Sequence, residues 1–213
     1  MIHNSVDNLI GIKKEIQLKK GTQIIAVSKT FPIVNILPLI NYGHEHYGEN
    51  KVQEAIDKWT DIKIQNKNIK LHLIGKLQTN KVKFAVKIFD YIHSLDNEKL
   101  AAKIATEQIK HDKKIKIFIQ INIGNEEQKS GIKKKEAFAF YKYCKSLNLN
   151  VIGIMCIPPQ EKSSENYFLE MNKINQELNL IELSMGMSED YLIAAKYNST
   201  FLRIGSKIFG KRT

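Results

Sequence analysis

Short runs of apolar residues alternate along the chain with segments in which apolar residues recur at helical spacing. The first run, Ile24 to Val27, is too brief for a helix and predicts a buried strand. The same alternation predicts further strands at His46–Tyr47, Leu71–Ile74, Tyr91–Leu95, Ile115–Ile123, Val151–Ile157, Ile181–Leu183 and Phe201–Ile204. Helices are predicted between them, over residues 33–41, 50–59, 79–87, 97–110, 133–147, 164–178 and 188–197. A helix with Ser5 as its N-cap is predicted ahead of the first strand.

The segment Ile115 to Ile123 has the clearest strand pattern. Isoleucine occupies every odd position, whereas the even positions include Phe118, Gln120 and Asn122. Because successive side chains of a strand point to opposite faces, the isoleucines are expected to pack against covering helices. The other face then carries polar groups toward the C-terminal end of the strand.

Eight strands, each followed by a helix, predict a single α/β domain over residues 1–213, folded as a (β/α)8 TIM barrel. The alternative is an open doubly wound sheet, which usually carries a glycine-rich turn after its first strand. Here that strand is followed by Ser28-Lys29-Thr30-Phe31-Pro32, and the chain contains no GxGxxG or GxxxxGK[ST] motif.

Composition narrows the class of protein. The formal net charge of +11 suggests nucleic-acid binding, but arginine occurs only at Arg203 and Arg212, and the lysines are spread along the whole chain. Dedicated nucleic-acid surfaces use arginine as well as lysine, so solvated helix faces explain the charge better and no nucleic-acid partner is expected. Two cysteines exclude a disulfide scaffold, and no apolar run approaches the ~20 residues that span a bilayer, so a cytoplasmic protein without membrane contact is expected.

Lys29 is the first candidate for chemistry. It follows the first strand, and catalytic or ligand-binding side chains concentrate at the C-terminal ends of barrel strands. Partial desolvation there would lower the pKa of the amine and make it available for Schiff-base formation. The alternative is an ordinary exposed loop lysine, which position alone favours in so lysine-rich a chain.

The loops after the last two strands form the second candidate. In this fold they often bind phosphate. Gly205 would let the backbone approach an anion, and Ser206 offers a hydroxyl; the stretch Leu183 to Ser188 has the same small-residue character. The alternative is that these small residues only end strands and cap helices.

Other polar residues have weaker signals. His44 and His46 lack a third ligand at suitable spacing, so no metal site is expected. His72 and His93 lie inside strands and are expected to be hydrogen-bonded core residues. Asn50 could face the barrel mouth or cap the next helix, and Met185 and Met187 are expected to pack rather than bind.

Eight motifs in order resemble the YggS/PROSC family of pyridoxal phosphate homeostasis proteins, from about residue 23 to residue 212. They are Ala26-Val27-Ser28-Lys29 with Pro32, Tyr47-Gly48-Glu49-Asn50, His72-Leu73-Ile74-Gly75-Lys76-Leu77-Gln78, His93-Ser94, Lys129-Ser130-Gly131, Gly153-Ile154-Met155, Leu183 to Ser188 with Asp190, and Arg203-Ile204-Gly205 with Phe209-Gly210.

The resemblance implies a fold-type III barrel like the N-terminal domain of alanine racemase, with pyridoxal 5′-phosphate (PLP) bound to Lys29. It also implies that Arg203 faces the pyridine nitrogen, that Asn50 lies near the ring, and that three residues help to hold the phosphate, namely Ser184, Gly205 and Ser206. One departure is Asn198, where the family often has glycine; asparagine also tolerates a left-handed backbone.

Three functions remain open at this point. The leading hypothesis is a PLP carrier in cofactor homeostasis, with little or no turnover, monomeric, and with PLP-dependent apoenzymes as partners. An arginine opposite the ring nitrogen weakens carbanion chemistry, and no second domain is expected after Thr213 to supply an opposing acid or base. The alternatives are a PLP-dependent racemase or related enzyme, and a basic nucleic-acid-binding module.

Overall fold

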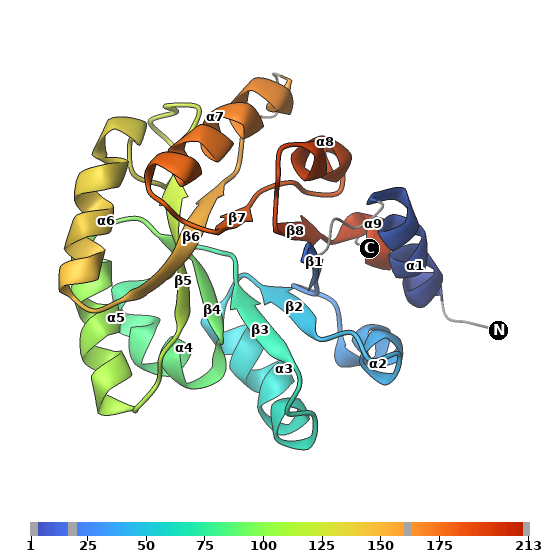
Figure 1. Cartoon of the computed structure of the whole chain (residues 1–213). Helices are drawn as coiled ribbons and strands as arrows, with labels where there is room; N and C mark the ends of the chain where they lie inside the picture. The colour runs from blue at the N-terminus through green and yellow to red at the C-terminus, as the bar shows by residue number, and fades with distance from the viewer. Residues whose placement is uncertain (1–3, 17–20, 160–162, 211–213) are drawn as a thin grey trace.

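The computed structural model describes residues 4–16, 21–159 and 163–210, and these residues form a closed parallel barrel. Neighbouring strands pair in chain order, and β1 closes the barrel by pairing with β8, Ile25 opposite Arg203 (Figure 1). The predicted barrel is therefore confirmed, and the open sheet is excluded. The strands are β1 (Gln23–Val27), β2 (His46–Glu49), β3 (Lys70–Leu73), β4 (Tyr91–Leu95), β5 (Lys116–Ile121), β6 (Asn150–Cys156), β7 (Glu182–Ser184) and β8 (Phe201–Ile204).

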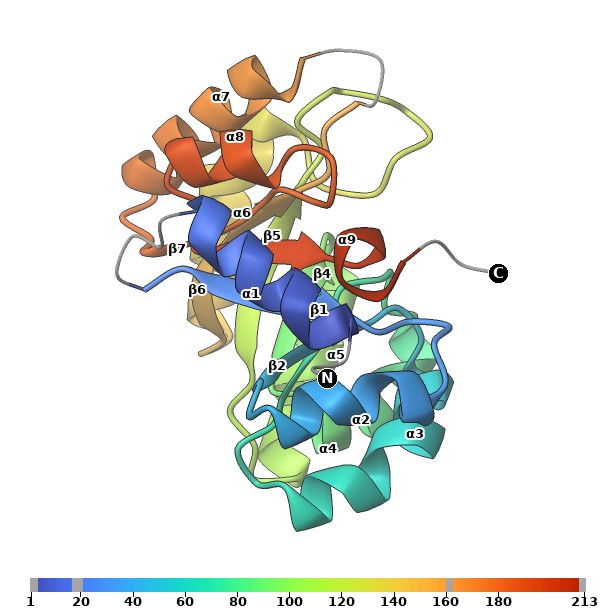
Figure 2. The same cartoon turned by 90° about the vertical axis from the view of Figure 1, so that its right-hand side faces the viewer.

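Helices cover the outside of the barrel, as two perpendicular views show (Figures 1 and 2). They are α1 (Asn4–Ile16), α2 (Ile33–Asn41), α3 (Val52–Gln65), α4 (Val82–Ile88), α5 (Glu98–Lys110), α6 (Ala137–Ser146), α7 (Ser164–Glu177), α8 (Tyr191–Lys196) and α9 (Ser206–Phe209), with 3-10 turns η1 (Thr79–Lys81) and η2 (Lys134–Glu136). Among the residues described, no helix has the length and apolar character needed to cross a membrane.

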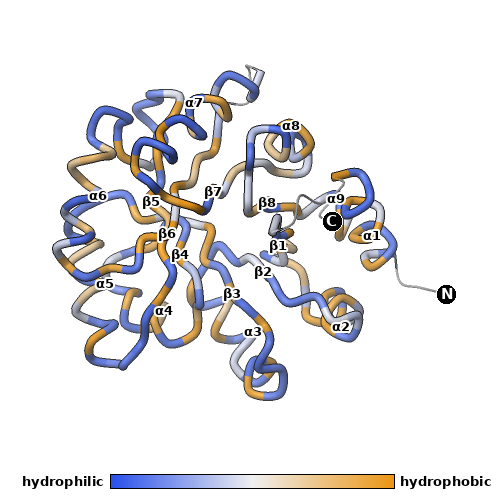
Figure 3. Tube along the Cα trace, viewed as in Figure 1, coloured by the Kyte–Doolittle hydropathy of each residue, from blue (hydrophilic) through white to orange (hydrophobic). Residues whose placement is uncertain are grey.

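Two separate layers of buried side chains follow from the alternation along the strands. Ile117, Ile119 and Ile121 of β5 belong to the large core between the strands and the helices. Phe118 points the other way, into the barrel interior, where it packs with Ile25 and other residues of the inner cluster. The two faces predicted for this strand are confirmed. The covering helices change between hydrophobic and hydrophilic residues along their length, as amphipathic helices do (Figure 3).

The first and last helices lie side by side. The Asn8 amide donates to the Ile208 carbonyl oxygen at 3.0 Å, and Lys207 pairs with Glu15 at 3.3 Å. Figures 1 and 2 both show α1 against α9. Ser5 lies inside α1 and is buried, so its prediction as the N-cap was wrong. Val6 and Leu9 of the same helix bury their side chains in the core, at about 1.5–3 kcal/mol of stabilisation each.

Candidate functional site

A cavity of about 410 Å³ opens at the C-terminal ends of the strands. Five of the six residues singled out from the sequence line it: Lys29, Asn50, Arg203, Gly205 and Ser206. They come from the ends of β1, β2 and β8, which closure of the barrel brings together. The remaining lining residues are apolar or thioether side chains, namely Val27, Ile74, Ile157 and Met187. The cavity thus combines cationic and polar groups with apolar walls.

The loop that carries Lys29 is held by α3. Thr30 has a φ of 67°, a left-handed conformation that is rare for a β-branched residue. The Thr30 amide donates to Glu54 Oε1 at 2.5 Å, and Lys58 Nζ donates to the Ser28 carbonyl oxygen at 3.0 Å. Side chains from one helix therefore fix the residues on both sides of Lys29, at the expense of local backbone strain.

A buried carboxylate anchors this arrangement from below. Glu49 Oε1 accepts hydrogen bonds from Ser28 Oγ at 2.7 Å, from Trp59 Nε1 at 2.9 Å and from Lys58 Nζ at 3.0 Å. Burial raises the pKa of Glu49, and these three donors counteract that effect. Because Ser28 directly precedes Lys29, the network ties the end of β1 to β2 and α3.

Asn50 is placed by a close backbone approach. A Cβ added to Gly75 would lie 2.4 Å from the Asn50 carbonyl oxygen, so only glycine fits there. The N-cap of α3 is Lys51, and Asn50 lines the cavity. Of the two positions left open by the sequence, Asn50 occupies the one at the barrel mouth.

Arg203 carries a buried positive charge with unused donors. Its Nη1 donates to Ser184 Oγ and its Nη2 to the Cys156 carbonyl oxygen, both at 2.7 Å. A guanidinium has five N–H groups, so three donors have no recorded partner among the described residues. Within the same part of the chain no carboxylate forms an ion pair with it, and the side chain is only 4% exposed. The remaining N–H groups can therefore take an acceptor from the cavity, which Arg203 lines.

The turn between β8 and α9 has room for an anion. A Cβ on Gly205 would touch Val27 at an ordinary 3.4 Å, and its φ of −115° is open to any residue. The missing side chain therefore leaves space in the cavity rather than relieving strain. Ser188 Oγ accepts long hydrogen bonds from the Gly205 amide at 3.3 Å and from the Lys207 amide at 3.4 Å.

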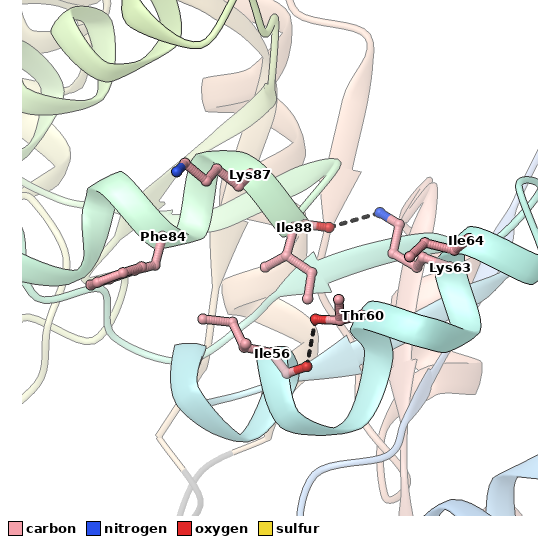
Figure 4. Close-up of a pocket in the computed structure, with 7 residues that line it drawn as sticks. All are labelled: Ile56, Thr60, Lys63, Ile64, Phe84, Lys87 and Ile88. Atoms are coloured by element: carbon pink, nitrogen blue, oxygen red, sulfur yellow. Dashed lines mark hydrogen bonds between the residues drawn. The ribbon is translucent and has the colours of Figure 1, made fainter.

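A second cavity lies on the helical layer, away from the strand ends. It measures about 440 Å³ between α3 and α4 and is lined by Ile56, Thr60, Lys63, Ile64, Phe84, Lys87 and Ile88. Figure 4 shows that its one half-buried cation, Lys63, donates to the Ile88 carbonyl oxygen, at 2.7 Å. With no convergent polar groups beyond this, the groove lacks the chemistry of the barrel-mouth cavity.

Comparison with known proteins places this barrel in a family. Residues 6–213 match the family model described as alanine racemase, N-terminal domain. A pyridoxal phosphate homeostasis protein of Aquifex aeolicus is 36% identical, covering 89% of this chain and 87% of its own length. The chain belongs to the family of pyridoxal phosphate homeostasis proteins.

Other relatives extend this similarity. The pyridoxal phosphate homeostasis protein of Buchnera aphidicola is 38% identical, with 95% of each chain covered. Among solved structures, PipY of Synechococcus elongatus with PLP bound superposes with a TM-score of 0.87 at 31% identity, covering 97% of this chain and 100% of PipY.

Within this member of the homeostasis family, Ser184 is the one predicted residue outside the cavity lining. It lies in β7, fully buried, and its hydroxyl contacts Arg203 and His93. The reason is the strand alternation, which directs this side chain into the barrel interior below the mouth. Met187, expected only to pack, is part of the cavity wall, whereas Met185 is buried in the core.

Sequence reasoning missed two features of the homeostasis-family site. Ser188 was part of the small-residue stretch, but nothing in the spacing showed which serine approaches the Gly205 turn. His72 and His93 are buried and hydrogen-bonded as expected, yet their connection to each other crosses strands and has no signature in the sequence. Asn198 has a φ of 66°, which confirms the left-handed conformation expected there.

Proposed function

We propose that this chain holds PLP covalently on Lys29 and acts in intracellular PLP homeostasis, buffering and handing over the cofactor with little or no catalytic turnover. The supporting relatives are named for pyridoxal phosphate homeostasis, and PipY was solved with PLP bound. The observation that carries the proposal is the shared cavity, which is lined by Lys29, by the guanidinium of Arg203 and by the turn at Gly205.

Each lining residue has a part in holding the cofactor. Lys29 Nζ bonds to the aldehyde carbon as a Schiff base, with release of one water. Arg203 directs its remaining N–H groups at the ring nitrogen, and Asn50 lies beside the ring. The phosphate is held at the turn, where Gly205 leaves space beside Val27 and Ser206 offers its amide and its hydroxyl.

The same residues keep the site chemically quiet. Bound PLP supplies an electron sink for carbanions, and the sink is strongest when its ring nitrogen is protonated. Arg203 can only donate hydrogen bonds, so it favours the unprotonated ring. Of the described residues that line the cavity, Lys29 is the one amine, and none is a histidine, a carboxylate or a thiol.

A racemase remains the alternative function, because the barrel also matches the alanine racemase N-terminal domain. Racemisation requires proton donors and acceptors on both faces of the substrate carbon. The apolar and thioether side chains of the lining include Ile74, Ile157 and Met187, which cannot move protons. We therefore expect no exchange of the α-proton of either alanine enantiomer in D2O at enzyme-like rates; rapid exchange with both enantiomers would replace the carrier by the racemase.

The covalent link is tested by borohydride reduction. The purified protein with PLP should be yellow, and mass spectrometry after reduction should place the pyridoxyl group on Lys29. Lys29→Ala should abolish the adduct, whereas Lys51→Ala, an exposed lysine beside Asn50, should leave it unchanged. A protein that stays colourless with excess PLP would refute the proposal, and so would an adduct that survives in Lys29→Ala at full yield.

Homeostasis further requires that bound PLP reach other proteins. We propose that the chain is monomeric and delivers PLP to PLP-dependent apoenzymes. Mixing the loaded protein with an apo-aminotransferase should restore transaminase activity faster than dilution alone releases PLP. Equal rates of PLP release in the presence and absence of the apoenzyme would show that transfer occurs through free solution. Light scattering tests the monomer, because it measures the mass of the carrier.

A further inference from the structure

The barrel interior contains an unbroken set of polar contacts below the cavity. Arg203 Nη1 lies 2.7 Å from Ser184 Oγ, which in turn lies 2.9 Å from His93 Nδ1. His93 Nε2 lies 2.9 Å from His72 Nδ1. His72 Nε2 lies 2.9 Å from His46 Nδ1, at the first residue of β2. We call Ser184, His93, His72 and His46 the histidine series; it runs from Arg203 to the opposite, N-terminal mouth of the barrel.

The hydrogen bonds of the histidine series can run in one direction only. Arg203 must donate, so Ser184 Oγ accepts from it. The proton of Ser184 has one recorded acceptor among the described residues, His93 Nδ1, because Ser184 is fully buried and makes no other side-chain contact there. His93 therefore carries its proton on Nε2 and donates to His72 Nδ1. The same step puts the proton of His72 on Nε2, directed at His46 Nδ1.

The histidines of the series are neutral at neutral pH, and two of their rings stack on aromatic side chains. Burial, with the charge of Arg203 as the second cause, lowers the pKa of His93 well below its ordinary value, and burial does the same for His72. The His93 ring stacks on Phe118 with centroids 4.2 Å apart, and the His72 ring stacks on Tyr91 at 4.1 Å. Neutral, stacked rings can each satisfy one donor and one acceptor, which is what a one-directional series requires.

We propose that the histidine series positions Arg203. With its proton directed at His93 Nδ1, Ser184 Oγ presents a lone pair to Nη1. Together with the Cys156 carbonyl oxygen, this acceptor holds the guanidinium with its three remaining N–H groups available to the cavity. Ser184 is thus a positioning residue that acts through Arg203, not a phosphate ligand. The part that concerns the cofactor rests on the proposed function, whereas the direction of the hydrogen bonds does not.

The direction is measured on the unliganded protein. Long-range proton–nitrogen NMR of histidine-labelled protein at neutral pH should show His46, His72 and His93 as neutral rings with the proton on Nε2. A proton on Nδ1 of His93 or His72, or a positive charge on either, would overturn the proposal. This measurement needs no variant, and it stands even if the protein binds no PLP.

The positioning role is measured by absorbance of the PLP-loaded protein. Ser184→Ala should shift the visible absorbance maximum while borohydride still traps the cofactor on Lys29. Ser184→Thr, which keeps the hydroxyl, should restore the maximum. Met155→Leu alters the same barrel interior without any hydrogen bond and should leave the spectrum unchanged. Wild-type spectra in Ser184→Ala, or an equal shift in Met155→Leu, would refute the positioning role; loss of the adduct in the wild type would instead refute the proposed function.

Discussion

The buried histidines should make the fold sensitive to mild acid. Burial lowers the pKa of His46 from 6.5 to about 4, and burial, followed by the charge of Lys13, lowers that of His44 to about 3. The unfolded chain takes up protons on these rings near pH 6.5, while the native chain does not. The unfolded state therefore binds more protons below that pH, and stability must fall as the pH falls from about 6.5 toward the native pKa values.

The size of the loss follows from the two pKa values of each ring. Between about pH 7.5 and about pH 5, linkage gives a loss of about 2 kcal/mol for His46 and about the same for His44. His72 and His93 act with the same sign because their pKa values are also lowered. Glu49 opposes them, since a raised carboxyl pKa stabilises the fold as the pH falls through it.

Urea unfolding measures this loss. Trp59 is the single tryptophan of the chain and is fully buried, so its fluorescence reports unfolding directly. The two rings together should decrease the free energy of unfolding by about 4 kcal/mol over this pH range, and His46→Gln should reduce the decrease by about 2 kcal/mol. A decrease below about 1 kcal/mol in the wild type, or an unchanged pH slope in His46→Gln, would refute the reasoning.

Three further outcomes follow from packing and charge. Gly153→Ala should destabilise the fold by more than about 3 kcal/mol, because the added Cβ would lie 1.9 Å from a backbone oxygen of β7. Gly11→Ala has open space around the added Cβ in α1 and should stabilise the fold by about 0.5–1 kcal/mol. Thermal unfolding measures both changes. Lys58→Met should lower the free energy of unfolding by about 3–5 kcal/mol, because it leaves Glu49 without its cation. The loss should be larger at about pH 8 than at about pH 5, because the pKa of Glu49 is raised and the carboxyl takes up a proton as the pH falls. Equal losses at the two pH values would contradict this. Both cysteines are buried with pKa values raised to about 12, so neither should react with a thiol reagent until urea unfolds the chain.

The sequence by itself determined the architecture and directed attention to the groups that we propose bind the cofactor. The alternation that marks β5 is a local property, because side chains two apart on a strand share a face whatever the rest of the chain does. Eight such strands with helices between them have few ways to close, so the barrel could be predicted. Gly205 directly follows β8 and Lys29 stands two residues after β1, and parallel strands bring their C-terminal ends to one mouth.

Only the tertiary structure decided which groups meet below that mouth. The sequence predicts Ser184 at the phosphate, but strand alternation directs its hydroxyl into the barrel, and the pairing of β7 with β8 places it against Arg203. The contact of His72 with His93 depends on the shear and stagger of neighbouring strands. The local pattern of apolar and polar residues does not predict that stagger. Contacts across a closed sheet are set by global register, and this is the physical reason that the chain's periodicity revealed the barrel but not the hydrogen-bonded series inside it.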